Sequence, residues 1–376
     1  MSRLPDLIVT AIALAATLIA LAPLNLARRR SAVAARMFAL IAGLAALLAA
    51  RLLAWSGSAV AAIPLLLVAS WLPLLALLVA EQLVRRHAPR WMKLLVLAGG
   101  TGFTIVSLIA GALWPAPVLL ALAGFQTVAI LCAVGLIVRS RGEVSPAEAQ
   151  LGGVFAAALL LAIPLTASDF QAIFTLPVRG GAFAALLLVL ATSRYLAGTA
   201  SLRTLLIDLI LLAAAGVILA AGAHAIWPAA NVAELVQIGA IGAATAALAL
   251  LLQRRGEARL ILQARPSLVK LIAALPDRPR LDDLLSVHPL PASGRLVEAD
   301  MLAAYPAEAV DMLAAERVST RASGDAVRDL LDAYAGTHLV RLARSPLRLL
   351  AVSGGGLAGD GLTAELDMVS RVAEAS

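Results

Sequence analysis

The feature that most constrains this chain is a series of apolar segments, each close to the roughly 20 residues that a helix needs to cross a hydrocarbon core. Nine such segments precede residue 253, at about 7–26, 37–55, 58–80, 94–113, 116–138, 150–167, 180–197, 204–226 and 235–252. Apolar residues make up 61% of the chain and charged residues 14%, and the mean hydropathy of +0.94 excludes an ordinary soluble protein. We therefore predict an all-α integral membrane helical bundle of about nine transmembrane helices over residues 1–252.

Two of these segments, the seventh and the first, differ from the others. The seventh is the weakest, because Arg179 and Arg194 bracket only fourteen residues and both side chains must extend outward for the segment to span. If it does not span, the count falls to eight. The first segment differs from a cleaved signal peptide, since its apolar run is long and ends in three arginines at 28–30. We expect it to remain as an anchor.

The distribution of basic residues predicts the orientation of the bundle. The loops after segments one, three, five and seven hold twelve Lys or Arg residues, whereas the opposite side has only Arg3, Arg51 and Arg179. Because Lys and Arg concentrate in cytoplasmic loops, we expect a periplasmic N-terminus and a cytoplasmic C-terminal region. Bases in such short loops indicate topology and argue against a nucleic-acid partner. Arg outnumbers Lys by 28 to 2, which favours a GC-rich bacterial genome and the inner membrane.

The composition changes after Leu252. Residues 253–280 form a basic, interrupted helical stretch that we interpret as a juxtamembrane helical linker. Residues 281–376 have the pattern of a soluble cytoplasmic α+β domain. The predicted helices are 306–315, 324–335 and 362–374, and the predicted strands are 295–299, 317–320, 338–343 and 347–353.

The glycine-rich stretch SGGGLAGDG at 353–361 has the spacing of a nucleotide-binding loop. A dinucleotide fold also needs a second strand and an acidic residue about 20 positions further on, and only seventeen residues follow Gly359. A P-loop is excluded as well, since no lysine follows Lys270. We interpret the glycines as a strand-to-helix connection and expect no nucleotide cofactor.

Catalytic and metal-binding motifs are also missing from the sequence. The only asparagines, Asn25 and Asn231, lie outside the cytoplasmic region, so a kinase has no metal-binding Asn there. Pro289 follows His288 directly, which favours a turn over a phospho-accepting helix. The four histidines are scattered and Cys132 is the only cysteine, so we expect no metal site and no cofactor.

Polar residues gather in two predicted outer loops. Asp169, Gln171 and Arg179 lie between segments six and seven, and a second group flanks the loop between segments eight and nine: His224, Asn231 and Glu234. Such a cluster at a membrane mouth can bind a small ligand or a proton, with the histidine as the titrating group. The simpler interpretation is a solvated rim.

One acidic residue lies inside a predicted span. Asp208 follows Arg203 by five residues in segment eight. An intramembrane acid is a candidate functional group, so we consider the two as a candidate polar pair. The alternative is a charge at the start of the helix that only stabilises its N-terminus or pairs with the arginine.

The order of parts resembles bacterial multi-helix membrane sensor proteins with a small GAF-like cytoplasmic domain. The closing pattern THLVRLARSPLRLLAVSGGGLAGDG followed by a terminal helix also carries this resemblance. It implies a non-enzymatic sensor or scaffold that passes a membrane or periplasmic signal to a cytoplasmic protein partner of residues 253–376. A transporter, suggested by prolines in or beside the segments, and an integral membrane enzyme are the alternatives. Transport requires polar groups at mid-membrane, whereas a sensor can keep its polarity at the rim.

The orientation gives a direct test. A reporter that is active only in the cytoplasm, fused after Gly256, should be active in the full-length membrane protein, because the basic loops place that end inside. The control is a reporter fusion at the 114–117 loop, which should be inactive. An inactive fusion after Gly256 in a stable product would refute the orientation.

Overall fold

The structure is a computed structural model, and it describes residues 4–28, 32–55, 59–84, 86–110, 114–141, 146–170, 176–196, 201–264, 294–303, 305–320, 323–334, 336–352 and 360–375. The chain divides into two compact units. The first is formed mainly by the residues up to Arg255, and the second mainly by the residues from Gly256 onward.

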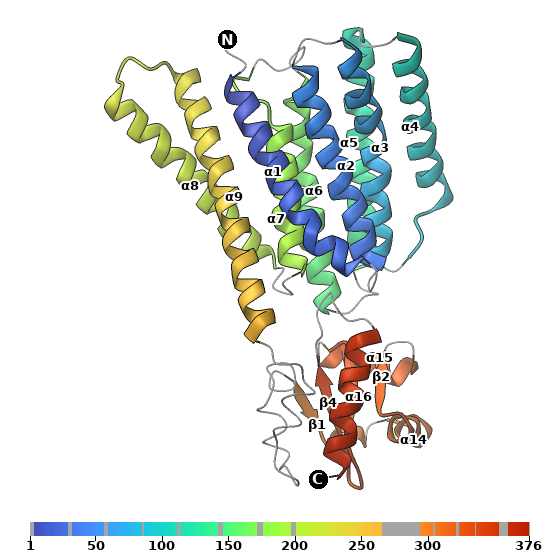
Figure 1. Ribbon diagram of the computed structural model, residues 1–376. Helices are drawn as coiled ribbons and strands as arrows, with labels where there is room; N and C mark the ends of the chain where they lie inside the picture. Colours follow the sequence, from blue (N-terminus) through green and yellow to red (C-terminus); the bar gives the residue numbers. More distant parts are fainter. Residues whose placement is uncertain are drawn as a thin grey trace. The chain divides into compact units, whose positions relative to one another are not determined.

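The described part of the first unit is built from nine α-helices. Consecutive helices run in opposite directions, so the chain passes repeatedly from one end of the unit to the other (Figure 1). The helices are α1 (Leu4–Ala27), α2 (Ala32–Ala54), α3 (Ala59–Val84), α4 (Arg90–Ala110), α5 (Ala116–Arg139), α6 (Pro146–Ala167), α7 (Gly181–Leu196), α8 (Leu202–Ile226) and α9 (Val232–Ala264).

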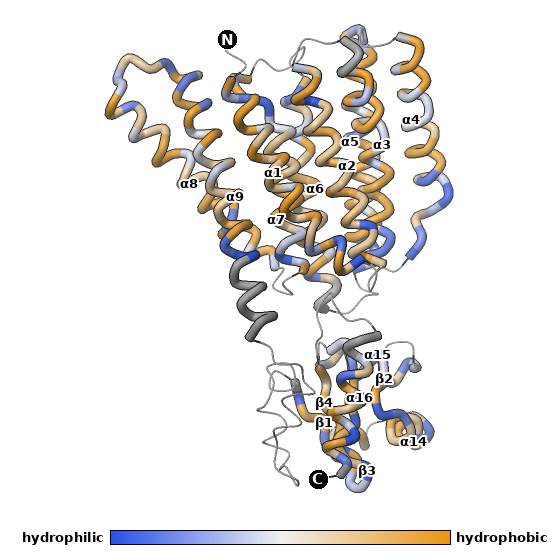
Figure 2. Tube along the Cα trace, viewed as in Figure 1, coloured by the Kyte–Doolittle hydropathy of each residue, from blue (hydrophilic) through white to orange (hydrophobic). Residues whose placement is uncertain are grey.

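Eight of these helices are long and apolar enough to cross a membrane. The exception is α7, which has 16 residues and corresponds to the segment that the sequence marks as weakest. Figure 2 shows apolar residues along the lengths of the helices and hydrophilic residues mainly near their ends. The expected bundle of long apolar helices is therefore confirmed for eight helices, each of which could span a membrane.

The short helix α7 is the most completely buried of the unit. Every residue from Ala184 to Thr192 is at most 5% exposed. A helix that is apolar on all faces needs neighbours on all faces or a lipid environment. Since its neighbours supply the cover, α7 packs in the interior of the bundle, whereas α8 exposes many large apolar side chains, such as Ile210 and Ile218.

Helices α8 and α9 approach each other at glycines. A Cβ atom on Gly216 would lie 2.8 Å from the carbonyl oxygen of Gly239, and one on Gly239 would lie 3.0 Å from the carbonyl oxygen of Gly216. Small residues at a helix crossing allow backbones to come this close in a membrane, where dispersion contacts drive helix association. The two glycines therefore fix where α8 and α9 cross.

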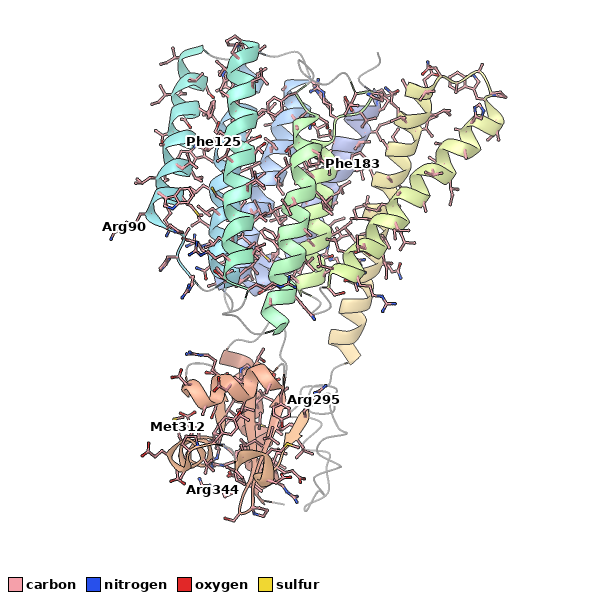
Figure 3. All side chains as sticks on the ribbon, turned by 180° about the vertical axis from the view of Figure 1, so that it is seen from behind. Arg90, Phe125, Phe183, Arg295, Met312 and Arg344 are labelled. Atoms are coloured by element: carbon pink, nitrogen blue, oxygen red, sulfur yellow. The ribbon has the colours of Figure 1, made fainter. Side chains whose placement is uncertain are left out.

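Aromatic side chains join α4 and α5. The Phe103 ring lies 5.5 Å from the ring of Phe125, which Figure 3 labels on α5, and 5.8 Å from the ring of Trp114, which precedes that helix. Offset and tilted ring pairs at such separations add to the energy of burial. This contact positions α4 at the edge of the bundle.

The second unit contains a four-stranded antiparallel sheet. Its strands are β1 (Arg295–Val297), β2 (Val318–Thr320), β3 (His338–Arg344) and β4 (Leu347–Val352), in the order β1-β4-β3-β2. The central hairpin pairs Leu339 with Ala351 and Val340 with Leu350. The helices of this unit are α13 (Ala299–Leu302), α14 (Ala307–Ala315), α15 (Asp325–Ala333) and α16 (Asp360–Ala375).

Both faces of this sheet are covered. One face packs Leu339 and Leu349 against Leu313 of α14 and Leu331 of α15. The other face belongs to a second cluster, formed by Val340, Leu342, Leu350, Val352 and Leu366 of α16. Successive strand residues point to opposite faces, so the apolar run of the hairpin supplies both cores.

The predicted elements of this unit agree with the observed ones within about two residues, as is usual for element ends. The small α+β region is therefore confirmed. One element differs, since the short helix α13 was not predicted. The predicted linker at 253–280 is described only as far as Ala264, where α9 ends.

The glycine crossing leads to a stability prediction. Gly216→Ala should destabilise the first unit, because its new methyl group meets the carbonyl oxygen of Gly239, and a helix shift costs packing energy. Gly222→Ala is the matched control on α8, since nothing lies within 4 Å of a Cβ there and alanine favours helix by up to about 1 kcal/mol. Thermal unfolding in detergent should give a lower melting temperature for the first variant only. Equal melting temperatures would contradict the proposed close contact.

Candidate functional site

An ion pair joins α2 to the start of α7 at the end of the bundle that contains the N-terminus of α1. Arg51, in the last turn of α2, donates through Nη1 to Asp169 Oδ2 at 2.8 Å and through Nη2 to Oδ1 at 3.1 Å. The Gly181 amide, at the start of α7, donates to Asp169 Oδ1 at 2.9 Å. Arg51 is 5% exposed, whereas the Asp169 side chain is 27% exposed, so the arginine is buried and its partner reaches the solvent. Two parallel hydrogen bonds to a carboxylate are the strongest arrangement available to arginine.

A second pair lies beside the first. The backbone amide of Arg179 donates to Asp6 Oδ1 at 3.0 Å, and its guanidinium Nε lies 3.6 Å from Asp6 Oδ2. The guanidinium carbons of Arg51 and Arg179 lie 5.5 and 5.8 Å from the centre of the Trp55 ring. We call these five residues, Asp6, Arg51, Trp55, Asp169 and Arg179, the outer cluster. It holds α1, α2, α6 and α7 together.

The predicted outer rim is only partly assembled. Asp169 and Arg179 lie in the outer cluster, whereas Gln171 lies outside the described residues. Asn231 and Glu234 instead cap α9, since the Asn231 amide donates to Glu234 Oε2 at 3.0 Å and the Glu234 amide donates to Asn231 Oδ1 at 2.9 Å. His224 is exposed near the end of α8. The two predicted loops still approach, because Gln237 Nε2 of α9 donates to the carbonyl of Pro177 at 3.1 Å.

The sequence interpretation missed Asp6 and Arg51 as site residues. The signal was present, since Arg51 is one of few bases on a side that is poor in them. A buried base there requires an acidic partner. The sequence could not identify that partner, because Asp169 is 118 residues away.

An elongated cavity of about 400 Å³ extends from the outer cluster into the bundle. Its volume falls within the roughly 300–1,000 Å³ of small-molecule pockets. Arg51, Asp169, Arg179 and Gly181 line its polar end. Its walls are mostly apolar and come from five helices: Leu40, Leu44 and Leu47 of α2; Leu65, Leu66, Ala69, Leu72, Pro73 and Ala76 of α3; Leu119, Leu122, Gln126 and Ile130 of α5; Leu159, Ala162 and Thr166 of α6; Ala184 and Leu188 of α7.

The polar side chain in the middle of this cavity has a structural role. Pro73 has no N–H, so the carbonyl of Ala69, four residues earlier in α3, lacks its usual helical donor. Gln126 Nε2 of α5 donates to that carbonyl at 2.9 Å. The amide therefore repairs the hydrogen bonding of α3 and joins it to α5.

A third polar group, the inner cluster, lies at the opposite end of α7. Asp208 of α8 accepts from Arg194 Nη2 at 2.9 Å and from Arg194 Nε at 3.2 Å, and it also pairs with Arg254 of α9. Arg254 Nη1 donates to Ser193 Oγ at 3.4 Å. The inner cluster, Ser193, Arg194, Asp208 and Arg254, thus joins α7, α8 and α9 around a carboxylate that is 1% exposed.

This geometry corrects the candidate pair of Arg203 and Asp208. Five residues along a helix correspond to a rotation of about 140°, so the two side chains point away from each other. Arg203 is exposed, and Asp208 pairs with Arg194 and Arg254 instead. The acid is therefore more than a charge near a helix N-terminus.

The second unit has a buried arginine of its own. Arg341 of β3 is 0% exposed and its Nε donates to Glu374 Oε1 at 2.6 Å. Burial raises the pKa of Glu374, but the hydrogen bond from Arg341 and the charges of three nearby arginines outweigh it and bring the pKa below 4.5. Burial lowers the pKa of the His338 ring from its ordinary value. These contacts tie α16 to the sheet.

Across the described part of the chain, no group of three or more His, Cys, Asp or Glu residues could hold a metal ion. The glycine-rich stretch at 353–359 and His288 lie outside the described residues. The chain matches no protein-family model, no curated protein and no solved structure. The outer cluster, the inner cluster and the cavity therefore carry the functional proposal.

The inner cluster leads to a matched pair of variants. Asp208→Asn should destabilise the first unit by about 3–5 kcal/mol, because it leaves two arginines near an uncharged amide. Arg203→Gln, on the same helix, should change stability by no more than about 0.5 kcal/mol, because its side chain is exposed. Thermal unfolding in nanodiscs measures both. A large effect of the Arg203 variant would restore the pair expected from the sequence.

Proposed function

We propose that this protein is a non-enzymatic membrane sensor, in which α7 connects a ligand-accessible outer cluster to α9 and the cytoplasmic region. In this proposal the bundle lies in a bacterial inner membrane with a periplasmic N-terminus. The nine helices cross the bilayer, and α7 spans because Arg179 and Arg194 extend from its ends. Residues 253–376, GAF-like in kind, then present the signal to a cytoplasmic protein partner.

The observation that carries this proposal is the attachment of α7 at both ends. Gly181 at its start bonds Asp169 of the outer cluster, and Arg194 in its last turn bonds Asp208 of the inner cluster. Thirteen residues separate these positions, which corresponds to about 20 Å along a helix. Helix α7 is buried along its length, so it is closely packed against its neighbours. A displacement of one end of α7 therefore shifts the contacts at its other end.

Helix α9 continues this connection beyond α7. Arg254 pairs with Asp208, and α9 continues to Ala264. With 33 residues, α9 is about 50 Å long, which exceeds the roughly 30 Å of a hydrocarbon core. Its last turns therefore extend past the apolar region.

A transporter is the second candidate, and the cavity is the observation in its favour. Against it, the described charges lie near helix ends, and the cavity's central polar group, Gln126, is used to bond Ala69. The prolines that suggested broken helices, at positions 23, 64, 73 and 164, lie inside continuous helices, and Pro117 lies in the first turn of α5. The sensor therefore explains more of the structure.

The sensor proposal predicts that a change at the outer cluster moves the inner end of α9. Spin labels at Val138→Cys on α5 and Leu252→Cys on α9, both exposed positions, report that distance by electron paramagnetic resonance once Cys132 is replaced by serine. Asp169→Asn should shift the mean distance by about 1–2 Å or add a second population, as helix shifts in switching proteins do.

The matched control for this measurement is Glu234→Gln. It makes the same chemical change at the outer end, but its side chain only caps α9. It should leave the distance between the labels unchanged. An unaltered distance in a folded Asp169→Asn protein would refute coupling through α7.

A further inference from the structure

The shape of the cavity constrains what it can hold. On α2 its lining residues are Leu40, Leu44, Leu47 and Arg51, which share one face of the helix over eleven positions. That spacing corresponds to about 16 Å along the helix axis. On α5 the lining residues from Leu119 to Ile130 cover the same number of positions. A volume of about 400 Å³ divided by a length of about 16 Å gives a mean cross-section of about 25 Å². The cavity is therefore long and narrow, parallel to the helices, which suits a single hydrocarbon chain.

The polar end of the cavity favours ligand atoms that accept hydrogen bonds. Asp169 already accepts from two Arg51 nitrogens and from the amide of Gly181. Arg51 has five N–H donors and uses two of them on this carboxylate. The lining residues include two arginines and one acid, and Asp6, which pairs with Arg179, makes the outer cluster neutral overall. The start of α7 adds the positive end of its helix dipole.

We propose that this cavity binds one acyl chain of an amphiphile whose anionic head group, a carboxylate or a phosphate, lies against Arg51 and Arg179. The chain runs from the outer cluster past Leu44 and Leu122 to Leu188 and Leu159. This inference deepens the proposed function. It rests on that function only where the amphiphile is treated as the signal. A free fatty acid and a membrane phospholipid share this chemistry, and the test separates them.

The test uses photochemical labelling of the full-length protein in nanodiscs. The probes are palmitic acid with a diazirine in mid-chain, hexadecanol with the same diazirine, and phosphatidylglycerol carrying the same modified acyl chain. Tandem mass spectrometry locates the adducts. We expect saturable adducts on cavity residues such as Leu44, Leu122 and Leu188 with the palmitic acid or phosphatidylglycerol probe. The probe that labels identifies the source of the chain.

Two comparisons decide the proposal. Cavity labelling by the hexadecanol probe should be about tenfold weaker, equivalent to about 1.4 kcal/mol, because its head group is uncharged. Leu159→Trp, which fills the cavity, should abolish the cavity adducts, whereas Leu160→Trp should not, because Leu160 is 43% exposed and absent from the lining. Adducts confined to outward-facing residues in wild-type protein would overturn the proposal. Cavity labelling by the hexadecanol probe that equals the labelling by the palmitic acid or phosphatidylglycerol probe would also overturn it.

The result also separates this inference from the sensor. Cavity labelling by palmitic acid without any change in the distance between positions 138 and 252 would support the amphiphile site and refute its role as the signal. A distance change in Asp169→Asn without cavity labelling would support the sensor and refute the amphiphile site.

Discussion

The ion pair between Arg51 and Asp169 is the interaction on which the arrangement of the first unit depends. A guanidinium that is 5% exposed must be paired, since an isolated buried charge costs several kcal/mol. The pair brings the end of α2 to the end of α6, and the same carboxylate satisfies the amide of Gly181, one of the unpaired N–H groups at a helix start. A Cβ on Gly181 would lie 2.0 Å from Asp169 Oδ2, so glycine is required there. The position of α7 follows from this contact.

The cavity is a consequence of how the five surrounding helices are held. Protein interiors rarely contain voids larger than a water molecule. Here Ala69, Ala76, Ala162 and Ala184 line the space where larger side chains could fill it. The outer cluster fixes α2, α6 and α7 at one end, and the Gln126 contact fixes α3 against α5. Small lining residues on helices held in this way leave an unfilled volume that an apolar ligand can occupy.

Local patterns were sufficient for much of the fold. Apolar run length predicted eight helices that are long and apolar enough to cross a membrane, and the apolar runs at 338–343 and 347–353 predicted β3 and β4. The pattern at 324–335 predicted a helix, and Val327, Leu330 and Leu331 on one face of α15 are at most 2% exposed. Patterns of this kind succeed because they depend only on neighbours in the sequence.

The contacts of the site depend on tertiary structure, so local patterns could not supply them. The interpretation of Asp208 gave weight to its nearness to Arg203 in sequence, although a five-residue spacing separates the side chains around the helix. Its real partners are 14 and 46 residues away. Asn231 and Glu234 are close in sequence to each other, and their spacing of three is that of a capping box, a local signal that explains them better than a ligand rim.

The two clusters also limit how α7 can move. The residues that line the interior between them are apolar apart from uncharged groups such as Gln126, so a charge that moves into this interior meets no opposite charge there. Sliding α7 by one turn, about 5.4 Å, would break its contacts at both ends and leave buried charges unpaired. Smaller shifts are less costly, because Asp208 holds two arginines and can strengthen one contact as the other weakens. A ligand biases such an exchange only by its difference in affinity for the two arrangements. An anionic head group beside Arg51 provides that difference, since it competes with Asp169 for the same guanidinium and therefore acts on the residue that bonds the start of α7.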